Sequence, residues 1–357
     1  MIESSSNIIK TKYEITFSKM HGAGNDFIVF ETNKVKRLDG TENEITLKEL
    51  QEITLKLSHR KLGVGFDQAI IINNDPKVLK SAHYEMIVIN SDGEQATMCG
   101  NGVRCFSKYI IDNCIESKSL NGTPKEDEKN GDIEQKIETL AGLVITYPKI
   151  SHHLNQYNLM MIKVNMNNAL ILKTNQYKDD EFESNILKKT ITNEKAYLYT
   201  IKDLGLTQCD QLECVLVSMG NPHCVVFLER NIELGNLSSE VASNLSTMKI
   251  DEIAIKLQKL PLFKDGCNVE FVSTTNSKTT NRVISRVFER GAGETLACGT
   301  GACGVAVASI LMSHCSHEKE VTVSMPGGDL LIQWSNETGE VFKTGPACTV
   351  FDSKIKL

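Results

Sequence analysis

Short hydrophobic runs, broken by polar and glycine-rich turns, recur along the chain and predict a protein built mostly of β-strands. Residues 13–32 are predicted to form a strand, a glycine-rich turn and a second strand. Two hairpins are expected, one from 268–275 with 281–290 and one within 320–335. Further strands are predicted, mainly from their β-branched content, over 66–73, 84–90, 138–148, 212–219, 224–229 and 339–351.

Helical spacing of apolar residues is found in only a few segments. Two of these, 103–114 and 305–315, follow the same phrase, Cys-Gly-x-Gly, and a shorter helical region is predicted over 238–246. Each half of the chain therefore has strands, a helix headed by a cysteine, and strands again. This order indicates an internal duplication.

Two segments, 116–136 and 174–195, are charged, rich in asparagine and without apolar periodicity. They are predicted to be surface insertions, the first of them disordered. At 357 residues the chain is long for one core and suggests two domains. The predicted organisation is a disordered lead-in over 1–12, an N-terminal half over 13–150 joined by 345–357, and a C-terminal half over 151–344.

Composition and charge exclude several classes of protein. With 41% hydrophobic and 24% charged residues the chain is typical of a globular protein, and no apolar run approaches the roughly 20 residues that span a bilayer. The first residues lack the apolar core of a signal peptide, and a net charge of −6 without a basic stripe argues against nucleic acid as a partner. We expect a cytoplasmic protein without a membrane partner.

The cysteines predict reduced thiols. There are 11 of them, an odd number, and no Cys-x-x-Cys spacing occurs. A disulfide framework and a structural zinc site are therefore not expected.

Cys99 and Cys298 carry the candidate chemistry, because each lies just before a predicted helix. Unsatisfied backbone N–H groups and the positive end of the helix dipole are expected to lower the thiol pKa there and to bind a carboxylate or phosphate. If the two halves face each other, one thiolate takes a proton from a substrate carbon while the opposite thiol returns one, and the stereocentre inverts. This chemistry calls for no pyridoxal phosphate and no metal.

Two plainer interpretations compete with this one. Cysteine is among the most buried residue types, and Cys105 and Cys303, inside their helices, are expected to be core thiols. Residues 299–304 spell the glycine pattern of a dinucleotide fingerprint, but an intervening turn and the absence of an acidic residue after the next strand argue against it. The repetition of the phrase at two helix starts favours reactive thiols.

Polar residues in predicted turns complete the candidate set. Asparagine in a turn usually serves the backbone, a single buried histidine is more often structural, and an adjacent Glu-Arg is usually a surface pair. The residues noted are Asn25, Gln68, Asn90, Asn221, His223, Asn268, Glu289 and Arg290.

Taken together, these motifs resemble the diaminopimelate epimerase family. The resemblance covers about Tyr13 to Phe351, except for the two insertions, and it is carried by KMHGAGNDF, NSDGEQATMCGNGVRCF, SMGNPH, NVEFV, VFERGAGETLACGTGAC, PGGDLLIQW and KTGPA. It implies a mixed α/β fold of two pseudo-symmetric domains, each with strands wrapped around a central helix. It further implies cofactor-independent interconversion of LL- and meso-diaminopimelate, in lysine and cell-wall precursor biosynthesis. Whether the protein is a homodimer stays open.

The resemblance also implies roles for individual residues. Cys99 and Cys298 match the two catalytic cysteines, and His223 and Glu289 match groups that assist the thiols and the reacting amine. Residues that match substrate contacts, at the reacting carboxylate or the distal amino-acid end, are Asn25, Gln68, Asn90, Gly100, Asn101, Asn221, Asn268, Glu289, Arg290, Gly299 and Thr300. The chain departs from many relatives at residues 165–170, Asn-Met-Asn-Asn-Ala-Leu, which contain no matched site residue.

Two other functions remain open at this point. Proline racemases share the two-cysteine plan, but they typically carry histidine where this chain has Asn101. Two facing thiols of low pKa would also suit a thiol redox protein.

Overall fold

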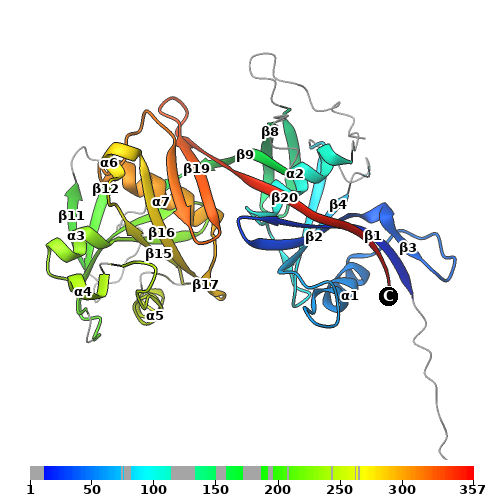
Figure 1. Cartoon of the computed structure of the whole chain (residues 1–357), viewed down its shortest axis with the longest axis horizontal. Helices are drawn as coiled ribbons and strands as arrows, with labels where there is room; N and C mark the ends of the chain where they lie inside the picture. The colour runs from blue at the N-terminus through cyan, green and yellow to red at the C-terminus, as the bar shows by residue number, and fades with distance from the viewer. Residues whose placement is uncertain are drawn as a thin grey trace, which may run out of the picture. The chain divides into compact units, whose positions relative to one another are not determined.

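Two helices, α2 (Gly102–Asp112) and α7 (Gly299–Leu311), are the central elements of the two structural units in a computed structural model of the chain (Figure 1). The structure describes residues 12–73, 75, 82–113, 133–149, 158–171, 186–191, 196–206, 209–242, 244–261, 263 and 266–357. The first unit comprises Met1–Gly22, Asp26–Ile162 and Ala347–Leu357, and the second comprises Ala23–Asn25 and Lys163–Pro346.

The unit boundaries fall inside strands. They lie after Ile162, within β9 (Leu159–Asn168), and after Pro346, within β20 (Glu340–Lys356), whereas the sequence placed them at 150/151 and 344/345. Hydrophobic patterning marks where a strand begins and ends, but it carries no sign of a strand shared by two units.

The first unit contains β1 to β8 with α1 and α2, together with parts of β9 and β20. Their bounds are β1 (Tyr13–Gly22), β2 (Asn25–Glu31), a 3-10 turn (Thr32–Lys34), β3 (Val35–Arg37), α1 (Leu47–Ser58), β4 (Gln68–Asn73), β5 (Tyr84–Asn90), β6 (Gln95–Ala96), β7 (Gln135–Thr139) and β8 (Gly142–Lys149).

The second unit contains the remaining strands and helices. Their bounds are β10 (Leu170–Ile171), β11 (Ile186–Ile191), β12 (Ala196–Ile201), β13 (Leu212–Ser218), β14 (Pro222–Phe227), α3 (Leu228–Glu233), α4 (Ser239–Ala242), α5 (Asp251–Gln258), β15 (Asn268–Ser273), α6 (Ser277–Thr280), β16 (Arg282–Glu289), β17 (Gly293–Thr295), β18 (Val321–Met325) and β19 (Gly328–Trp334).

Strand pairing confirms the pseudo-symmetry that the repeated phrase indicated. In the first unit β2 runs parallel to β4, β4 pairs antiparallel with β5, and β5 runs parallel to β7. In the second unit β14, β15, β16 and β18 repeat the same sequence of pairings. The central helix lies between β6 and β7 in one unit and between β17 and β18 in the other. The mixed α/β fold expected from the sequence is therefore confirmed.

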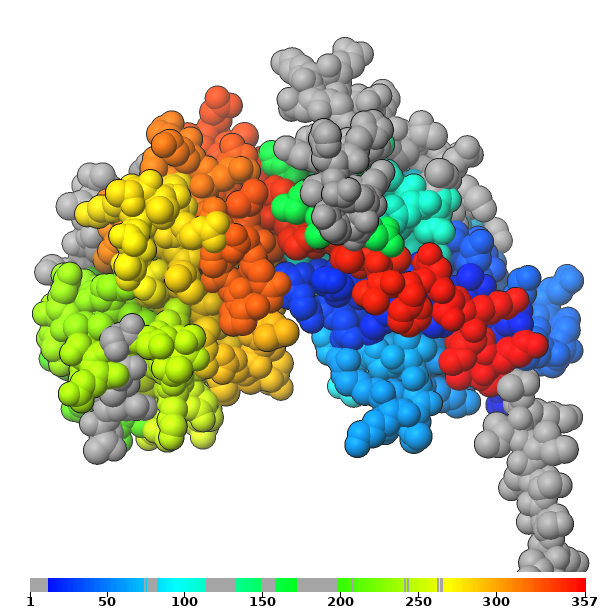
Figure 2. All heavy atoms as spheres, viewed as in Figure 1, coloured from blue at the N-terminus to red at the C-terminus, as the bar shows by residue number. Residues whose placement is uncertain are grey.

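Both central helices are buried on nearly all sides, as expected for helices enclosed by strands. Helix α2 contacts β1, β4 and β8, and helix α7 contacts β13 to β16, β18 and β19. Glycine, alanine, cysteine and valine dominate α7, and their small side chains let the surrounding strands approach closely. The carboxyl-terminal half of β20 pairs antiparallel with β1 and lies beside it on the surface of the first unit (Figure 2).

Several local predictions are confirmed. The turn between β1 and β2 places Ala23 and Gly24 at φ of 55° and 84°, a conformation that glycine-rich hairpin turns favour. The two predicted hairpins form as β15 with β16 and as β18 with β19. The helical region predicted over 238–246 is shorter, since α4 covers only Ser239–Ala242.

The second predicted insertion contains a strand that was not predicted from the sequence. Residues 186–191 form β11, which pairs antiparallel with β12, because a neighbouring strand can select an extended conformation that weak local patterning does not reveal. At the end of the first insertion, Gln135 starts β7 and is fully buried. Residues 116–132, 174–185 and 192–195 lie outside the described residues, as does the lead-in over 1–11.

The sequence analysis also missed four helices. Helix α1 begins with a capping box, in which Thr46 and Glu49 exchange hydrogen bonds between side chain and backbone. The others are α3, α5 and α6. No helix in the described ranges is long and apolar enough to span a membrane.

Candidate active site

The first cysteine phrase lies against the start of α2. The backbone N–H of Gly102 donates to Sγ of Cys99 at 3.2 Å, and the N–H of Val103 donates to its carbonyl at 2.9 Å. A Cβ on Gly102 would lie 3.2 Å from Cβ of Cys99 and 2.6 Å from Cδ1 of Ile70. Glycine at this position therefore lets the thiol lie next to the N–H groups of the first helical turn.

A buried arginine that the sequence analysis missed holds this phrase in shape. Arg104 is fully buried, and its Nη1 donates to Oδ1 of Asn101 at 3.0 Å and to the carbonyl of Gly100 at 3.3 Å. The guanidinium of Arg104, one helical turn further along the chain, thus holds Gly100 and Asn101, which are two predicted substrate contacts. Buried arginine is rare unless it is paired, so its place in a Cys-Gly-x-Gly helix was a usable signal.

Gln68 and Asn90 lie together in the first unit. They are opposite each other in the β4–β5 register, and Nε2 of Gln68 donates to Oδ1 of Asn90 at 2.8 Å. Both side chains are only half buried. The structure therefore brings two predicted substrate contacts into one polar pair.

A network of charged residues holds the chain next to Asn25 and Gln68. Asp26 accepts from Lys19 at 2.6 Å and from both terminal nitrogens of Arg60, and the same guanidinium donates to Asp67 at 2.7 Å. Burial alone would raise the pKa of Asp26, but the hydrogen bonds from Arg60 and Lys19 outweigh it and hold that pKa well below its usual value. Asn25 itself begins β2, half buried, in the Ala23–Asn25 segment that clusters with the second unit.

The second cysteine phrase has its thiol at the head of α7. Cys298 is the N-cap residue, and its sulfur accepts from the N–H of Gly301 at 3.4 Å. The hydroxyl of Thr300 lies 3.4 Å from the same sulfur, and Nδ2 of Asn268 lies 3.7 Å from it. Gly299 is the first residue of the helix and is buried. Groups that can donate hydrogen bonds therefore lie next to the sulfur of Cys298.

The helix end acts on Cys298 in the expected direction, but other effects outweigh it. Burial raises the pKa of this thiol well above its usual value, and the carboxylates of Glu289 and Glu270 raise it further. The contacts with Thr300 and Gly301 lower the pKa but offset only part of this increase. A helix dipole contributes little compared with removing a charge from water, so this environment favours the protonated form of the Cys298 thiol.

Glu289, Arg290 and Asn268 meet where β15 begins and β16 ends. The N–H of Arg290 donates to Oδ1 of Asn268 at 2.9 Å, so one asparagine side chain joins the strand end to the sulfur of Cys298. The hydroxyl of Thr295 donates to Oε1 of Glu289. Three predicted site residues thus lie around one thiol.

His223 and Asn221 form the other side of this group, together with a residue that the sequence analysis missed. His223 is fully buried, with Nε2 at 3.1 Å from Oδ1 of Asn221 and Nδ1 at 2.7 Å from Oε1 of Glu270. Glu270 lies two residues after Asn268 on β15, and side chains at this spacing share one face of a strand. That spacing was a signal that could have identified it.

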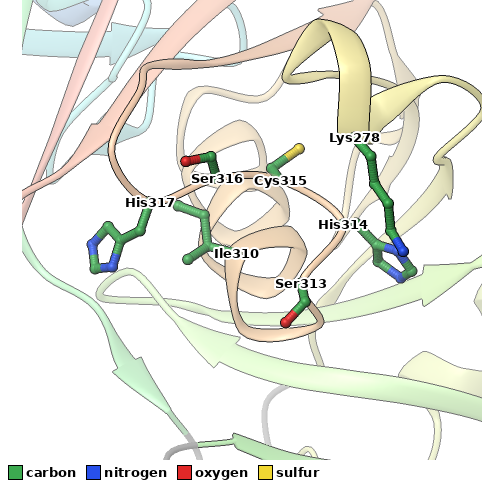
Figure 3. A pocket seen from close by; sticks show the side chains of 7 residues that line it. All are labelled: Lys278, Ile310, Ser313, His314, Cys315, Ser316 and His317. Carbon is green, nitrogen blue, oxygen red and sulfur yellow. The ribbon is translucent and has the colours of Figure 1, made fainter.

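A pocket of about 420 Å³ lies at the other end of α7 (Figure 3). It is lined by Lys278, Ile310, Ser313, His314, Cys315, Ser316 and His317. The two imidazoles pack against aromatic rings. The ring centroids of His314 and Phe227 lie 4.8 Å apart, and those of His317 and Trp334 lie 4.7 Å apart. In Figure 3 His317 points away from His314 and Lys278, and the pocket contains none of the predicted site residues.

The structure therefore forms two polar clusters, one at the start of each central helix. Cys99, Gly100, Asn101, Gln68 and Asn90 belong to the first unit, and the remaining predicted residues, including Cys298, belong to the second. All ten cysteines among the described residues are free thiols. Across the same residues, no three His, Cys, Asp or Glu side chains are grouped so that they could hold a metal ion.

Comparison with known proteins identifies the family to which the sequence belongs. The family model described as diaminopimelate epimerase matches residues 17–159 and 215–350. Diaminopimelate epimerase of Acetivibrio thermocellus is 31% identical over 96% of this chain and 98% of its own length. That of Desulfitobacterium hafniense is 34% identical over 93% of this chain and 95% of its own.

A solved structure shows the same fold at low sequence identity. The crystal structure of a probable proline racemase from Agrobacterium radiobacter K84 matches with a TM-score of 0.55 and 13% identity, covering 96% of this chain and 93% of that one. The family model and the two relatives, by contrast, match in sequence over most of the chain, so this protein belongs to the diaminopimelate epimerase family of isomerases.

Proposed function

We propose that this protein interconverts LL- and meso-diaminopimelate, and that Cys99 and Cys298 are its acid and base. The observation that carries the proposal is that each cysteine lies at the start of a central helix, with its sulfur accepting a backbone N–H from the first turn. Two such thiols in two pseudo-symmetric units supply the two groups that an inversion needs, one for each face of the carbon.

The thiolate of Cys99 takes the proton from the α-carbon, so the carbon–hydrogen bond breaks, a sulfur–hydrogen bond forms, and the electron pair moves toward the carboxylate. The thiol of Cys298 then gives its proton to the opposite face and becomes a thiolate. The reverse reaction exchanges the two roles. The burial of Cys298, which raises the pKa of its thiol, supports its part as the donor in this direction.

The charge that develops on the substrate carboxylate needs donors already in place. We infer that the N–H groups at Gly100 and Asn101, and at Gly299 and Thr300, bind this carboxylate, because the first turn of a helix points its N–H groups and the positive end of its dipole toward anions. His223 and Glu289 would assist the thiols and the reacting amine. Asn25, Gln68, Asn90, Asn221, Asn268 and Arg290 would then hold the substrate, largely at its distal amino-acid end.

Incubation of purified, reduced protein with LL-diaminopimelate, followed by chiral chromatography, tests the proposal. We expect meso-diaminopimelate to form after dialysis against a chelator and without added pyridoxal phosphate, metal or nicotinamide. L-Proline and trans-4-hydroxy-L-proline serve as the comparison substrates. Inversion of proline but not of diaminopimelate would assign the protein to the racemase alternative. Inversion only after a cofactor is restored would contradict the cofactor-independent mechanism.

Location and assembly belong to this proposal as well. A biosynthetic epimerase with reduced catalytic thiols suits the cytoplasm, where thiols are kept reduced. Fractionation of the host cell and light scattering of the purified protein would test a cytoplasmic location and a homodimer.

A further inference from the structure

Glu270 is a buried carboxylate for which the proposed mechanism has no use. It lies in the middle of β15 and is fully buried, as is His223, its hydrogen-bond partner. Within the described residues its other oxygen, Oε2, has no hydrogen-bond partner. A buried charge is costly unless it is well paired, and an apolar residue would often be more stable in its place. Stability alone therefore does not explain this residue.

The start of α7 leaves room for this carboxylate. A Cβ on Gly301 would lie 2.8 Å from Oε1 of Glu270 and 3.3 Å from Sγ of Cys298, so the carboxylate and the thiol border the same small space. One turn further on, a Cβ on Gly304 would lie 3.3 Å from Cβ of His223. Glycines at both positions bring the helix onto the imidazole–carboxylate pair.

The pair determines which ring nitrogen of His223 carries a fixed proton. An ionised carboxylate only accepts hydrogen bonds, so Nδ1 at 2.7 Å from Oε1 must carry a hydrogen whenever Glu270 is charged. The other nitrogen, Nε2, faces the side chain of Asn221, a residue assigned to the substrate. The tautomer of a functional histidine is commonly set by the hydrogen bond that its second nitrogen makes.

Other titratable groups surround Glu270 and belong to the same electrostatic cluster. They are His223 and Cys224 of β14, Cys267 just before β15, Glu289 of β16 and Cys298 at the head of α7. Burial raises the pKa of Glu270, and His223 lowers it part of the way back. The cationic form of His223 is therefore the partner that favours an ionised Glu270.

We propose that Glu270 is a positioning residue for the second thiol site: its carboxylate fixes a proton on Nδ1 of His223, so that Nε2, beside Asn221, is the nitrogen that exchanges protons with the site. Only the kinetic test of this inference, which measures kcat and KM, rests on the proposed function. The position of the proton on His223 is a property of the protein without substrate.

Nitrogen-15 NMR of histidine-labelled protein, recorded against pH, tests the proton position directly. In the wild type we expect the His223 signals to show hydrogen on Nδ1 throughout and a change at Nε2 only. In Glu270→Gln, which keeps the shape and removes the charge, the hydrogen should be shared between the two ring nitrogens, because the neutral amide can donate to Nδ1 as well as accept from it. Wild-type signals showing an unprotonated Nδ1 would overturn the proposal, even if no variant folds.

The kinetic measurement separates positioning from a purely structural role. Glu270→Gln should lower kcat at least tenfold with KM within about twofold, and it should shift the pH profile of kcat, whereas Glu270→Asp, which retains the charge, should restore part of kcat. The matched control is Glu229→Gln: Glu229 accepts from Ser273, Thr274 and Thr275 at the end of β15, opposite to the end that begins with Asn268, beside Cys298. The same kcat loss in both Gln variants, or an unchanged pH profile in Glu270→Gln, would contradict the proposal. If the wild type does not act on diaminopimelate, the NMR result still decides the role of Glu270.

Discussion

Nδ2 of Asn268 lies 3.7 Å from the sulfur of Cys298, while Oδ1 of the same side chain accepts the N–H of Arg290 at 2.9 Å. One buried amide thus points its donor at a thiol and its acceptor at the neighbouring strand end. Cys298 becomes a thiolate after it gives up its proton in the proposed reaction, and a donor aimed at the sulfur stabilises that charge.

Asn268→Asp should therefore impair turnover while preserving the fold. Aspartate keeps the acceptor for Arg290 but removes the donor and adds a negative charge beside Cys298. We expect kcat to fall about 10- to 100-fold, because a hydrogen bond to a charged group contributes about 1.5–3 kcal/mol. Steady-state kinetics check this result, with Asn336→Asp as a control that adds the same charge at an exposed turn. Equal kcat in the two variants would contradict a role for the amide.

Gly301→Ala should be more damaging than Gly304→Ala. A Cβ at position 301 would lie 2.8 Å from a buried carboxylate oxygen of Glu270 that is held by its hydrogen bond with His223, and the resulting overpacking should cost about 1–3 kcal/mol. At position 304 the nearest atom lies at 3.3 Å, and alanine gains helix propensity of about 1 kcal/mol over glycine. Chemical denaturation measures both variants. Similar destabilisation by both would show that the close approach of Glu270 to α7 is unimportant.

Local sequence patterns were sufficient to place the two cysteines at helix starts, but they did not predict the charged groups buried around Cys298. The position of Cys298 as an N-cap residue follows from a cysteine, two glycines and an apolar run, which are adjacent in sequence. Its raised pKa depends on burial and on Glu289 and Glu270, which reach it from other strands. No periodicity within one segment carries that information.

The pattern of residues in strand β15 could not identify Glu270 as part of the site either. All but the last of its residues are buried, so the strand is covered on both faces, and alternation could not distinguish Glu270 from a solvent-facing residue. Only its spacing of two from Asn268 relates it to the site.

Strand β11 was not predicted for a related reason. Its pairing with β12, rather than its own composition, defines it as a strand.

Asp26→Asn should destabilise the protein more at pH 7 than at pH 3, where part of the contribution of the carboxylate remains. The folded-state pKa of Asp26 is lowered, so its contribution is present above the unfolded value of 3.8 and is lost as pH falls through that range toward the folded-state pKa. At pH 7 we expect a loss of about 1.5–3 kcal/mol, since Lys19 and Arg60 lose their carboxylate. Urea denaturation at pH 7 and pH 3 measures the difference from wild type.

The matched control is Asp329→Asn, which breaks an exposed pair with Arg282 and should cost less than about 1 kcal/mol at either pH. A destabilisation by Asp26→Asn that is equally large at pH 3 would show that the charge of Asp26 is not its source.

Replacing residues 116–132 by a short Gly-Ser turn should leave turnover within about twofold, because the segment contains no predicted site residue and long surface loops are cheap to alter. Extending the deletion through Gln135 should destabilise the fold. Gln135 is fully buried, and its Oε1 accepts from Ser107 of α2 at 2.6 Å and from Thr146 of β8 at 3.2 Å. Thermal unfolding and epimerase assays compare the two deletions. A folded 116–132 variant with grossly reduced turnover would give the insertion a function.

The most direct test of the two-thiol mechanism is the reaction of LL-diaminopimelate in heavy water. Thiol protons exchange with solvent between turnovers, so product formed early should carry deuterium at the inverted carbon while recovered substrate stays largely unlabelled. Replacing Cys99 or Cys298 by alanine should abolish inversion, and serine, with its much higher pKa, should lower it steeply. Early product that retains the hydrogen of the substrate, or near-normal inversion by either alanine variant, would contradict the assignment of Cys99 and Cys298 as the two acid–base groups.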